Sequence, residues 1–188
     1  LGQLDRMIDD LENGQLQGVS ARTVVEGHDY VSRGLNAWRR GRFVPGPAAI
    51  IGTPTLFRGD LIREHPYDSS RVFSDDSELC ERWTNLFGAR FAISEAYVVE
   101  VGKASWEEVR IRCRMYGTSD AEIFRRGRSQ GWSLSRQARS LLHPLTADFV
   151  TPMTRLSRGD AWIATPFLAA FTVARYAYWV REATNGRD

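Results

Sequence analysis

The stretch IIGTPTLFRGDLIREHPYDSSRVFSDDSELCERWTNLFGARFAIS, residues 50–94, shows alternating strand-like and helix-like segments, and this alternation predicts the fold class. Residues 49–57 read as a strand, and Pro54 places it at a sheet edge, at a bulge or at a strand end. A short helix is expected over residues 59–65, and a longer one after the acidic run, with Gly88 as its C-terminal cap. Strands that alternate with helices predict an α/β layer.

The segments on either side extend this order and then become helical. The predicted elements are an amphipathic helix that stops at Asn13, a strand over 16–27, a helix over 28–40, an interruption at 44–49, a strand pair or one broken strand over 89–102, and helices over 105–117, 119–127 and 133–143, the last ending before Pro144. Ser105 is a candidate cap for the first of these three helices, and Ser119 or Asp120 for the second. We therefore expect an α/β part in residues 1–103 and a helical C-terminal extension packed on it in residues 104–188.

Residues 161–174 carry no charge and contain Pro166. They fall short of the about 20 apolar residues that a membrane span needs. We expect a buried helix here, and the alternative is a helix that lies in a membrane interface. Aromatic residues that favour this alternative are Trp162, Tyr176, Tyr178 and Trp179.

The composition is that of an ordinary globular protein, and the net charge of +2 gives no reason to expect nucleic-acid binding. Lys103 is the only lysine, which fits a GC-rich genome better than a specialised phosphate site. Cys80 and Cys113 form no CxxC pair, and the three histidines lack metal-ligand spacing. The start has no secretory signal and no methionine, so we expect a chain that begins partway through a longer protein.

The acidic run has two explanations. Asp75 and Glu78 fit a capping box, and each acid at a helix N-terminus contributes about 0.3–1 kcal/mol. The second explanation is catalytic, because a loop-to-helix junction can hold a carboxylate rigidly and still expose it to a substrate.

Residues 50–94 resemble the acceptor-side half of inverting family 2 glycosyltransferases, which have the GT-A fold. In that family a small-residue turn after a strand leads to an arginine and a short helix, then to an "fD" pair, an EDxDLxxR motif and an apolar helix that ends in glycine. The matching residues are Gly52, Thr53, Phe57, Arg58, Tyr67, Asp68, Asp75, Asp76, Ser77, Glu78, Leu79, Arg82 and Gly88. Asp75 and Glu78 exchange aspartate and glutamate relative to the family pattern, and both keep the charge.

The resemblance implies that Asp76 is the general base that takes the proton from an acceptor hydroxyl. Asp75 and Glu78 would tune or position it, and Arg82 would either limit the repulsion among the acids or anchor the helix. The same resemblance implies substrate contacts at Gly52, Thr53, Arg58, Glu78 and Arg82.

Residues 109–127 resemble the region that follows the motif in such enzymes. Arg110, Arg114 and Tyr116 are then candidates for contact with the diphosphate or the acceptor, although a solvated helix face is the more common explanation for such residues. Residues 165–182 are similar to the C-terminal "PF…R" helix of many members, which often lies close to a membrane.

The nucleotide-binding half of that family, with its metal-holding DxD motif, has no counterpart in this sequence. The expectation is therefore a fragment with a partial GT-A-like mixed sheet, flanking helices and a helical appendage. Mg²⁺ or Mn²⁺ would belong to the intact enzyme, with ligands mostly outside this chain. The implied partners are a nucleotide-sugar donor and a glycan or lipid-linked acceptor, with no nucleic acid. The implied setting is bacterial polysaccharide biosynthesis in the cytoplasm or at the inner face of the cell membrane.

Two other function classes stay open on sequence alone. One is a non-catalytic, arginine-rich module that binds a membrane surface or a protein partner. The other is a glycoside hydrolase that uses two of the acids Asp68, Asp75, Asp76 and Glu78. It ranks last, because adjacent residues on one helical turn are badly placed to flank a bond.

Overall fold

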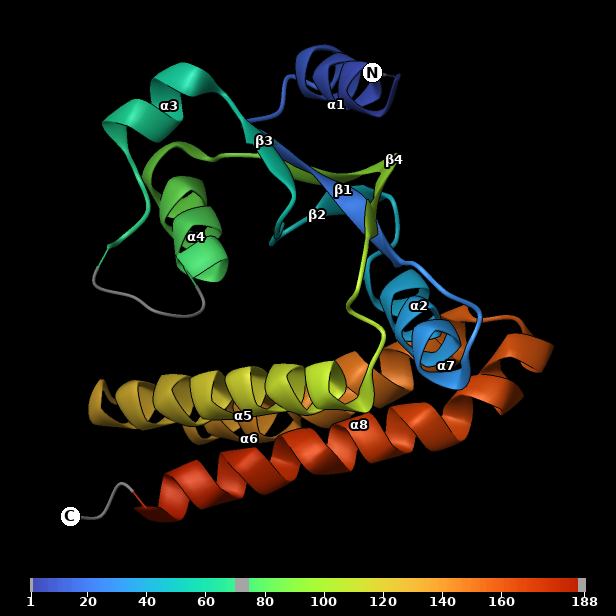
Figure 1. Ribbon diagram of the computed structural model, residues 1–188. Coiled ribbons are helices and arrows are strands. Elements are labelled where there is room, and N and C mark those ends of the chain that lie inside the picture. Colours follow the sequence, from blue (N-terminus) through green and yellow to red (C-terminus); the bar gives the residue numbers. More distant parts are fainter. Residues whose placement is uncertain (1, 70–74, 186–188) are drawn as a thin grey trace. The chain divides into compact units, whose positions relative to one another are not determined.

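The computed structural model describes residues 2–69 and 75–185 (Figure 1). The chain divides into two compact units, one from Leu1–Val24 and Phe43–Glu100 and the other from Val25–Arg42 and Val101–Asp188. The division falls close to the predicted boundary at residue 103, but residues 25–42 belong to the second unit. The expected α/β class is confirmed, and each unit has its own buried core.

The first unit is built on a mixed sheet in which the described strands follow the order β2-β4-β1-β3. These strands are β1 (Gly18–Val25), β2 (Gly46–Ala48), β3 (Thr55–Phe57) and β4 (Phe91–Glu100). β1 and β3 are antiparallel, with Val19 opposite Leu56. β2 and β4 are also antiparallel, with Pro47 opposite Ala92. The two three-residue strands therefore lie at the sheet edges, where a missing backbone donor is tolerated.

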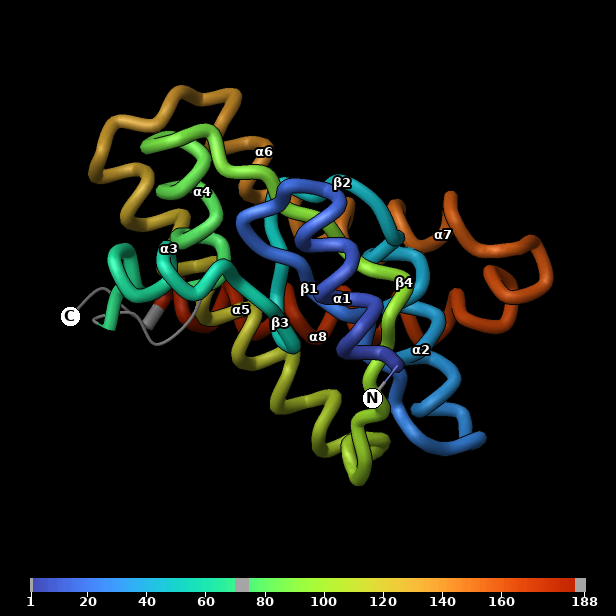
Figure 2. Tube along the Cα trace, turned by 90° about the horizontal axis from the view of Figure 1, so that it is seen from above, coloured from blue at the N-terminus to red at the C-terminus, as the bar shows by residue number. Residues whose placement is uncertain are grey.

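Helices α1 (Gly2–Asn13) and α4 (Asp75–Phe87) cover opposite faces of this sheet, and α3 (Gly59–Glu64) leads into the loop before α4 (Figure 1). Side chains alternate along β4: Phe91 and Ile93 enter the core under α4, whereas Ala96 enters the core under α1. Seen from above, α1 lies over β1 and β4 (Figure 2). The acidic motif forms the first turn of α4, so it lies on the sheet face that α4 covers.

The second unit is helical in its described residues. Its elements are α2 (Tyr30–Arg42), α5 (Trp106–Ser129), α6 (Leu134–Leu145), a π-helical turn (Thr146–Val150), α7 (Thr151–Arg155) and α8 (Arg158–Asn185). α5 and α8 make the most extensive contact, and their buried side chains join those of α2 in one core. Gly34 of α2 packs directly against the ring of Phe167 of α8, since a Cβ added to Gly34 would lie 2.3 Å from that ring.

A buried ion network crosses this core. Asp148, fully buried on the π-helical turn, accepts hydrogen bonds from Trp38 Nε1 at 3.0 Å, from Arg42 and from Arg175 Nη1 at 2.7 Å. Arg175 also binds both carboxylate oxygens of Asp120, at 2.7 and 2.9 Å. Charges so far from water are tolerated when they are paired and hydrogen-bonded in this way.

The structure corrects one helix boundary in α5. Residues 106–129 form a single helix, so the predicted break near residue 118 and the restart at Ser119 are wrong. Gly117 lies at the contact with α8, where an added Cβ would sit 2.5 Å from the carbonyl oxygen of Arg175. Asp120 binds Arg175 rather than capping a helix. Tertiary packing thus keeps a glycine inside the helix despite its low helix propensity.

The predicted strands also change. Residues 46–48 form β2 within the expected interruption. Their pairing with β4 satisfies backbone hydrogen-bonding groups at the edge of that strand, which local propensity does not reveal. The strand expected over 49–57 shortens to β3, which begins directly after Pro54 at a sheet edge as Pro54 predicted. β4 is one continuous strand rather than a pair or a broken strand.

Two helices differ from their predictions as well. α6 includes Pro144 instead of ending before it, and the π-helical turn follows directly. α8 is longer than the uncharged run and buries only one side of it, including Phe167, Leu168 and Phe171. Within residues 2–69 and 75–185, no helix is both long enough and apolar enough to span a membrane.

Candidate functional site

Asp76 lies in the first turn of α4, on the side of the helix that meets the core. Leu79, Cys80 and Trp83 are fully buried and fix the rotation of the helix. Asp76 precedes Leu79 by three residues and Cys80 by four, so it shares their face and is itself half-buried. The apolar spacing of the sequence therefore orients this carboxylate toward the inside of the first unit rather than toward bulk water.

The segment before β3 approaches this carboxylate. Ile51 is buried in the core under α4, and the next residue is Gly52. A Cβ built on Gly52 would lie 3.4 Å from Asp76 Oδ2. Because glycine has no side chain, space remains beside Oδ2 that any larger residue would take up.

Tyr67 approaches the other carboxylate oxygen. Its hydroxyl donates to Asp76 Oδ1 at 2.9 Å, and its ring packs edge-on against Phe57 of β3, with centroids 6.0 Å apart. The Asp75 carboxylate accepts from the Asp76 backbone N–H at 3.0 Å. Asp76 is thus held by a neutral donor on one side and has a second carboxylate close by.

The environment raises the pKa of Asp76 above its ordinary value. Burial is the largest cause, the Tyr67 hydrogen bond opposes it, and the charge of Asp75 adds to it. The pKa of Tyr67 is raised strongly, by burial and then by the charge of Asp76 and the hydrogen bond to it, so its hydroxyl stays protonated and donates at neutral pH. A half-buried carboxylate with increased proton affinity has the properties of a general base.

The neighbouring thiol also belongs to this cluster. Burial raises the pKa of Cys80, a hydrogen bond from the Ile51 backbone lowers it, and the charge of Asp76 raises it. A protonated, buried thiol is a poor nucleophile, so Cys80 contributes packing rather than covalent chemistry.

Glu78 and Arg82 form a separate pair along α4. Arg82 Nε donates to Glu78 Oε1 at 2.8 Å, and Arg82 Nη2 donates to the carbonyl oxygen of Pro66 at 2.6 Å. Glu78 thus turns forward along the helix, whereas the capping box requires it to reach back toward Asp75. Both roles expected for Arg82 have a contact here, since the pair with Glu78 offsets one of the acids and the bond to Pro66 ties α4 to the segment after α3.

Arg58 and Thr53 have different surroundings. Arg58 Nε donates to the Leu16 carbonyl oxygen at 3.1 Å, which fastens the start of α3 to the chain before β1. Thr53 is exposed. The structure therefore brings Gly52, Asp75 and Asp76 into one cluster, while Arg58, Glu78 and Arg82 make the connections that hold its frame.

The three downstream candidates belong to the second unit. Arg110 and Arg114 are exposed on α5, and Arg110 lies 3.9 Å from Glu107. Tyr116 is half-buried, 6.2 Å from the Trp38 ring, with the guanidinium of Arg175 5.1 Å from its own ring. Tyr116 therefore packs in the helical core, and the side chains of Arg110 and Arg114 lie in solvent.

Sequence reasoning assigned Tyr67 no role of its own, although its hydroxyl holds Asp76. The available signal was a tyrosine where the resembling family has phenylalanine, which adds one polar atom next to the acidic motif.

Asp75 and Asp76 lie at successive positions of one helical turn. They cannot flank a glycosidic bond from opposite sides at the about 5–10 Å separation that hydrolases use.

Among residues 2–69 and 75–185, no group of three or more histidine, cysteine, aspartate and glutamate side chains is arranged to hold a metal ion. Comparison of the chain with protein-family models, with curated proteins and with solved structures found no match.

Proposed function

We propose that this chain is the acceptor-side, catalytic-base part of an inverting glycosyltransferase of the GT-A type. The observation that carries the proposal is the half-buried Asp76, held by Tyr67 on one oxygen and faced by the side-chain-free Gly52 on the other. The family resemblance of residues 50–94 supports it, and so does the mixed sheet on which the motif is mounted.

The proposed reaction is a single displacement. An acceptor hydroxyl enters beside Gly52 and gives its proton to Asp76 Oδ2. Its oxygen forms the new bond to the anomeric carbon, while the bond from that carbon to the nucleoside diphosphate breaks and the diphosphate leaves with the electron pair. Tyr67 keeps Oδ1 engaged and so aims Oδ2 at the acceptor. Asp75 increases the proton affinity of the base.

The proposal assigns no described residue to the donor site. The described residues contain no set of ligands for the divalent cation that the resemblance implies, and the proposed reaction therefore assigns this cation no role within the described residues. The substrates proposed are a nucleotide sugar and a glycan or lipid-linked acceptor, in the cytoplasm or at the inner face of the membrane.

The test uses the complete natural polypeptide that contains residues 1–188. It is incubated with a panel of nucleotide sugars and candidate acceptors, and release of the nucleoside diphosphate is measured. With an active pair, Asp76→Asn should lower kcat by about 10²–10⁴-fold, because a positioned general base contributes that much. Donor affinity should stay unchanged, since Asp76 meets the acceptor.

Asp60→Asn is the matched control. It removes an exposed carboxylate from the first turn of α3 in the same unit and should leave kcat unchanged. Wild-type turnover in Asp76→Asn contradicts the assignment, and so does the absence of transfer from every donor in the panel.

A further inference from the structure

The second unit exposes a continuous apolar stripe on α8. The opposite side of this helix is buried in the core through Phe167, Leu168 and Phe171. The exposed residues of the stripe are Trp162, Ile163, Pro166, Ala170, Val173, Ala177 and Val180. From Trp162 to Val180 they recur at helical spacing, which at 1.5 Å per residue extends over about 27 Å. Trp162 is 81% exposed and Val173 68% exposed.

Helix α6 exposes its apolar side as well. Leu134 is 83% exposed and Leu142 53% exposed, and both lie on one side of the helix. The residues that face the rest of the unit are the buried Pro144 and the half-buried Gln137 and Ser140. A helix of a globular protein ordinarily does the reverse, with leucines inside and polar residues in water.

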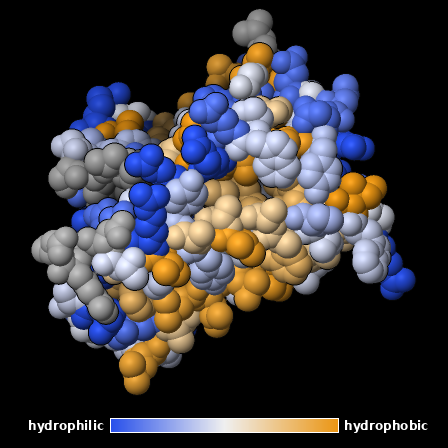
Figure 3. All heavy atoms as spheres, turned by 60° about the horizontal axis from the view of Figure 1, so that its bottom comes forward, coloured by the Kyte–Doolittle hydropathy of each residue, from blue (hydrophilic) through white to orange (hydrophobic). Residues whose placement is uncertain are grey.

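The two stripes lie on helices that are in contact with each other. The Tyr176 hydroxyl of α8 donates to the Leu141 carbonyl oxygen of α6 at 2.7 Å, so the two helices lie side by side within the second unit. Hydrophobic residues gather on the face on which α8 lies (Figure 3). We call this the α6–α8 surface, defined by the exposed apolar residues of both helices. Exposed apolar area of this extent marks an interaction site.

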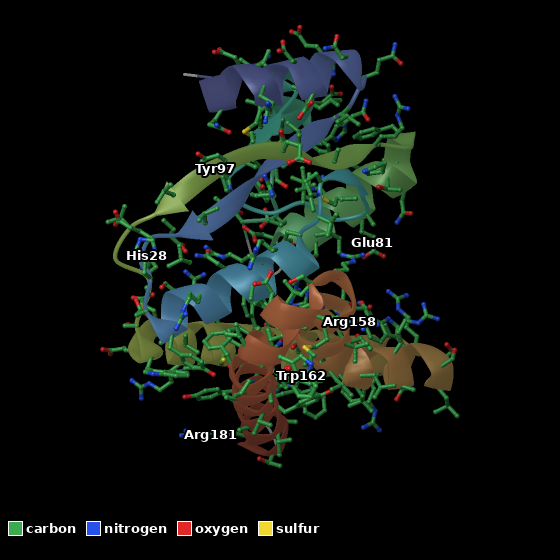
Figure 4. All side chains as sticks on the ribbon, turned by 90° about the vertical axis from the view of Figure 1, so that its right-hand side faces the viewer. His28, Glu81, Tyr97, Arg158, Trp162 and Arg181 are labelled. Atoms are coloured by element: carbon green, nitrogen blue, oxygen red, sulfur yellow. The ribbon has the colours of Figure 1, made fainter. Side chains whose placement is uncertain are left out.

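The charge around the surface is mainly positive, although α8 also carries the acidic Asp160 and Glu182. Residues 123–147 contain five arginines and no aspartate or glutamate, a formal charge of +5. Arg125 is paired with Glu182 and Arg126 with Glu122. Arg128, Arg136 and Arg139 are also exposed, on the end of α5 and on α6, and the guanidinium of Arg136 lies 4.3 Å from the Trp132 ring. Arg158 and Arg181 lie at the two ends of the α8 stripe (Figure 4).

This charge distinguishes between the occupants that could cover the surface. A second copy of the chain related by a two-fold axis would bring two copies of the same net positive surface together, and the like charges would repel. An anionic lipid surface attracts the arginines and also accepts the apolar stripe and Trp162 at its headgroup boundary. The combination of cations and exposed apolar residues therefore favours a lipid partner.

We propose that the α6–α8 surface lies in the interface of an anionic membrane, with both helices parallel to the membrane plane. Trp162 and the leucines of α6 enter the boundary between headgroups and acyl chains, and Arg136 and Arg139 bind the anionic headgroups. All of these residues belong to the second unit, whereas the proposed base belongs to the first. Lipid binding and glycosyl transfer can therefore fail independently.

The test is flotation of the 188-residue chain with two kinds of vesicle, phosphatidylcholine alone and phosphatidylcholine mixed with phosphatidylglycerol. We expect binding to the anionic vesicles only, weakened by added salt. Arg136→Gln with Arg139→Gln should lower the partition coefficient by about thirtyfold. Trp162→Ser with Val173→Ser should remove binding even at low salt.

Val99→Ser is the matched control. It removes an apolar side chain that is 52% exposed on β4 of the first unit, and it should bind as the wild type does. Because every changed residue is exposed, circular dichroism should report the same helix content in all variants. In brominated lipid, quenching of tryptophan fluorescence should fall in Trp162→Phe, which shows that this side chain enters the bilayer.

Three results would overturn the proposal. The first is no flotation with either vesicle. The second is equal flotation of the wild type and both double variants. The third is a wild-type dimer in light scattering that Trp162→Ser with Val173→Ser dissociates, without lipid binding, because a second copy would then be the occupant.

Discussion

Replacing Tyr67 with phenylalanine removes a hydrogen bond that stabilises the ionised form of Asp76. The hydroxyl donates to Asp76 Oδ1 at 2.9 Å, and a hydrogen bond to a charged group contributes about 1.5–3 kcal/mol. Tyr67 is half-buried, so water can replace part of this bond and the lower end of the range is expected. Burial and the charge of Asp75 raise the pKa of Asp76, and the Tyr67 hydrogen bond lowers it. The variant should therefore raise that pKa further.

Carbon-13 NMR of the aspartate carboxyl groups measures this in the 188-residue chain, with Asp76→Asn used to assign the resonance. The titration midpoint of Asp76 should move to higher pH in Tyr67→Phe. In the active enzyme the acidic limb of the kcat/KM profile should move the same way, while the alkaline rate is retained. Tyr97→Phe, which changes an exposed tyrosine of β4, is the control and should leave the midpoint in place. An unchanged or lowered midpoint in Tyr67→Phe refutes the reasoning.

The raised pKa of Asp76 also links its protonation to stability. A carboxyl whose pKa rises on folding favours the protonated folded state. Its stabilising contribution is complete below the unfolded pKa and is lost as pH rises through the folded pKa. Compared with the wild type, urea denaturation should show a larger loss of unfolding free energy from acidic to neutral pH in Tyr67→Phe. It should show a smaller loss in Asp76→Asn.

Two further predictions concern the second unit. Asp148→Ala leaves its buried cationic partner Arg175 with one carboxylate fewer and should lower the free energy of unfolding in urea by about 3–5 kcal/mol. The exposed Asp60→Ala is the control and should lower it by less than about 1 kcal/mol. An equally small loss in Asp148→Ala would contradict a buried network. Burial raises the pKa of Cys113 to about 12, with the charge of Asp148 adding to the effect and that of Arg175 opposing it. We therefore expect the buried Cys80 and Cys113 to resist iodoacetamide in the folded protein and to react in denaturant, and rapid alkylation of the native chain would show that the core opens.

The elements that the sequence predicted well are those set by neighbours along the chain. α4 ends at Phe87, and Gly88 has the positive φ of +67° that a C-terminal cap needs. Ser105 caps α5 through the backbone N–H of Glu108, as its position before an amphipathic run indicated. Pro54 marked the sheet edge correctly. Each of these signals acts over one turn or one strand, a range within which sequence alone determines the available hydrogen bonds.

The errors arise where distant partners decide. Gly117 reads as a break, but the close approach of α8 keeps the helix continuous. β2 is short and contains Pro47, and it becomes a strand because the edge of β4 lies beside it. Periodicity also groups Leu134 with Leu142 without showing that this side of α6 faces solvent. In each case the deciding contact is tertiary.

The sequence by itself determined most of the helical and extended segments, the caps at Gly88 and Ser105, the acidic start of α4 and the candidate base Asp76, because these depend on spacing and on residue chemistry. Only the tertiary structure placed the Tyr67 hydroxyl and the backbone of Gly52 beside that carboxylate, and only the tertiary structure joined Trp38, Asp148 and Arg175 over separations of up to 137 positions. The physical reason is that burial and hydrogen bonding across the core depend on how elements pack, and local periodicity determines which residues share a face but not what that face meets.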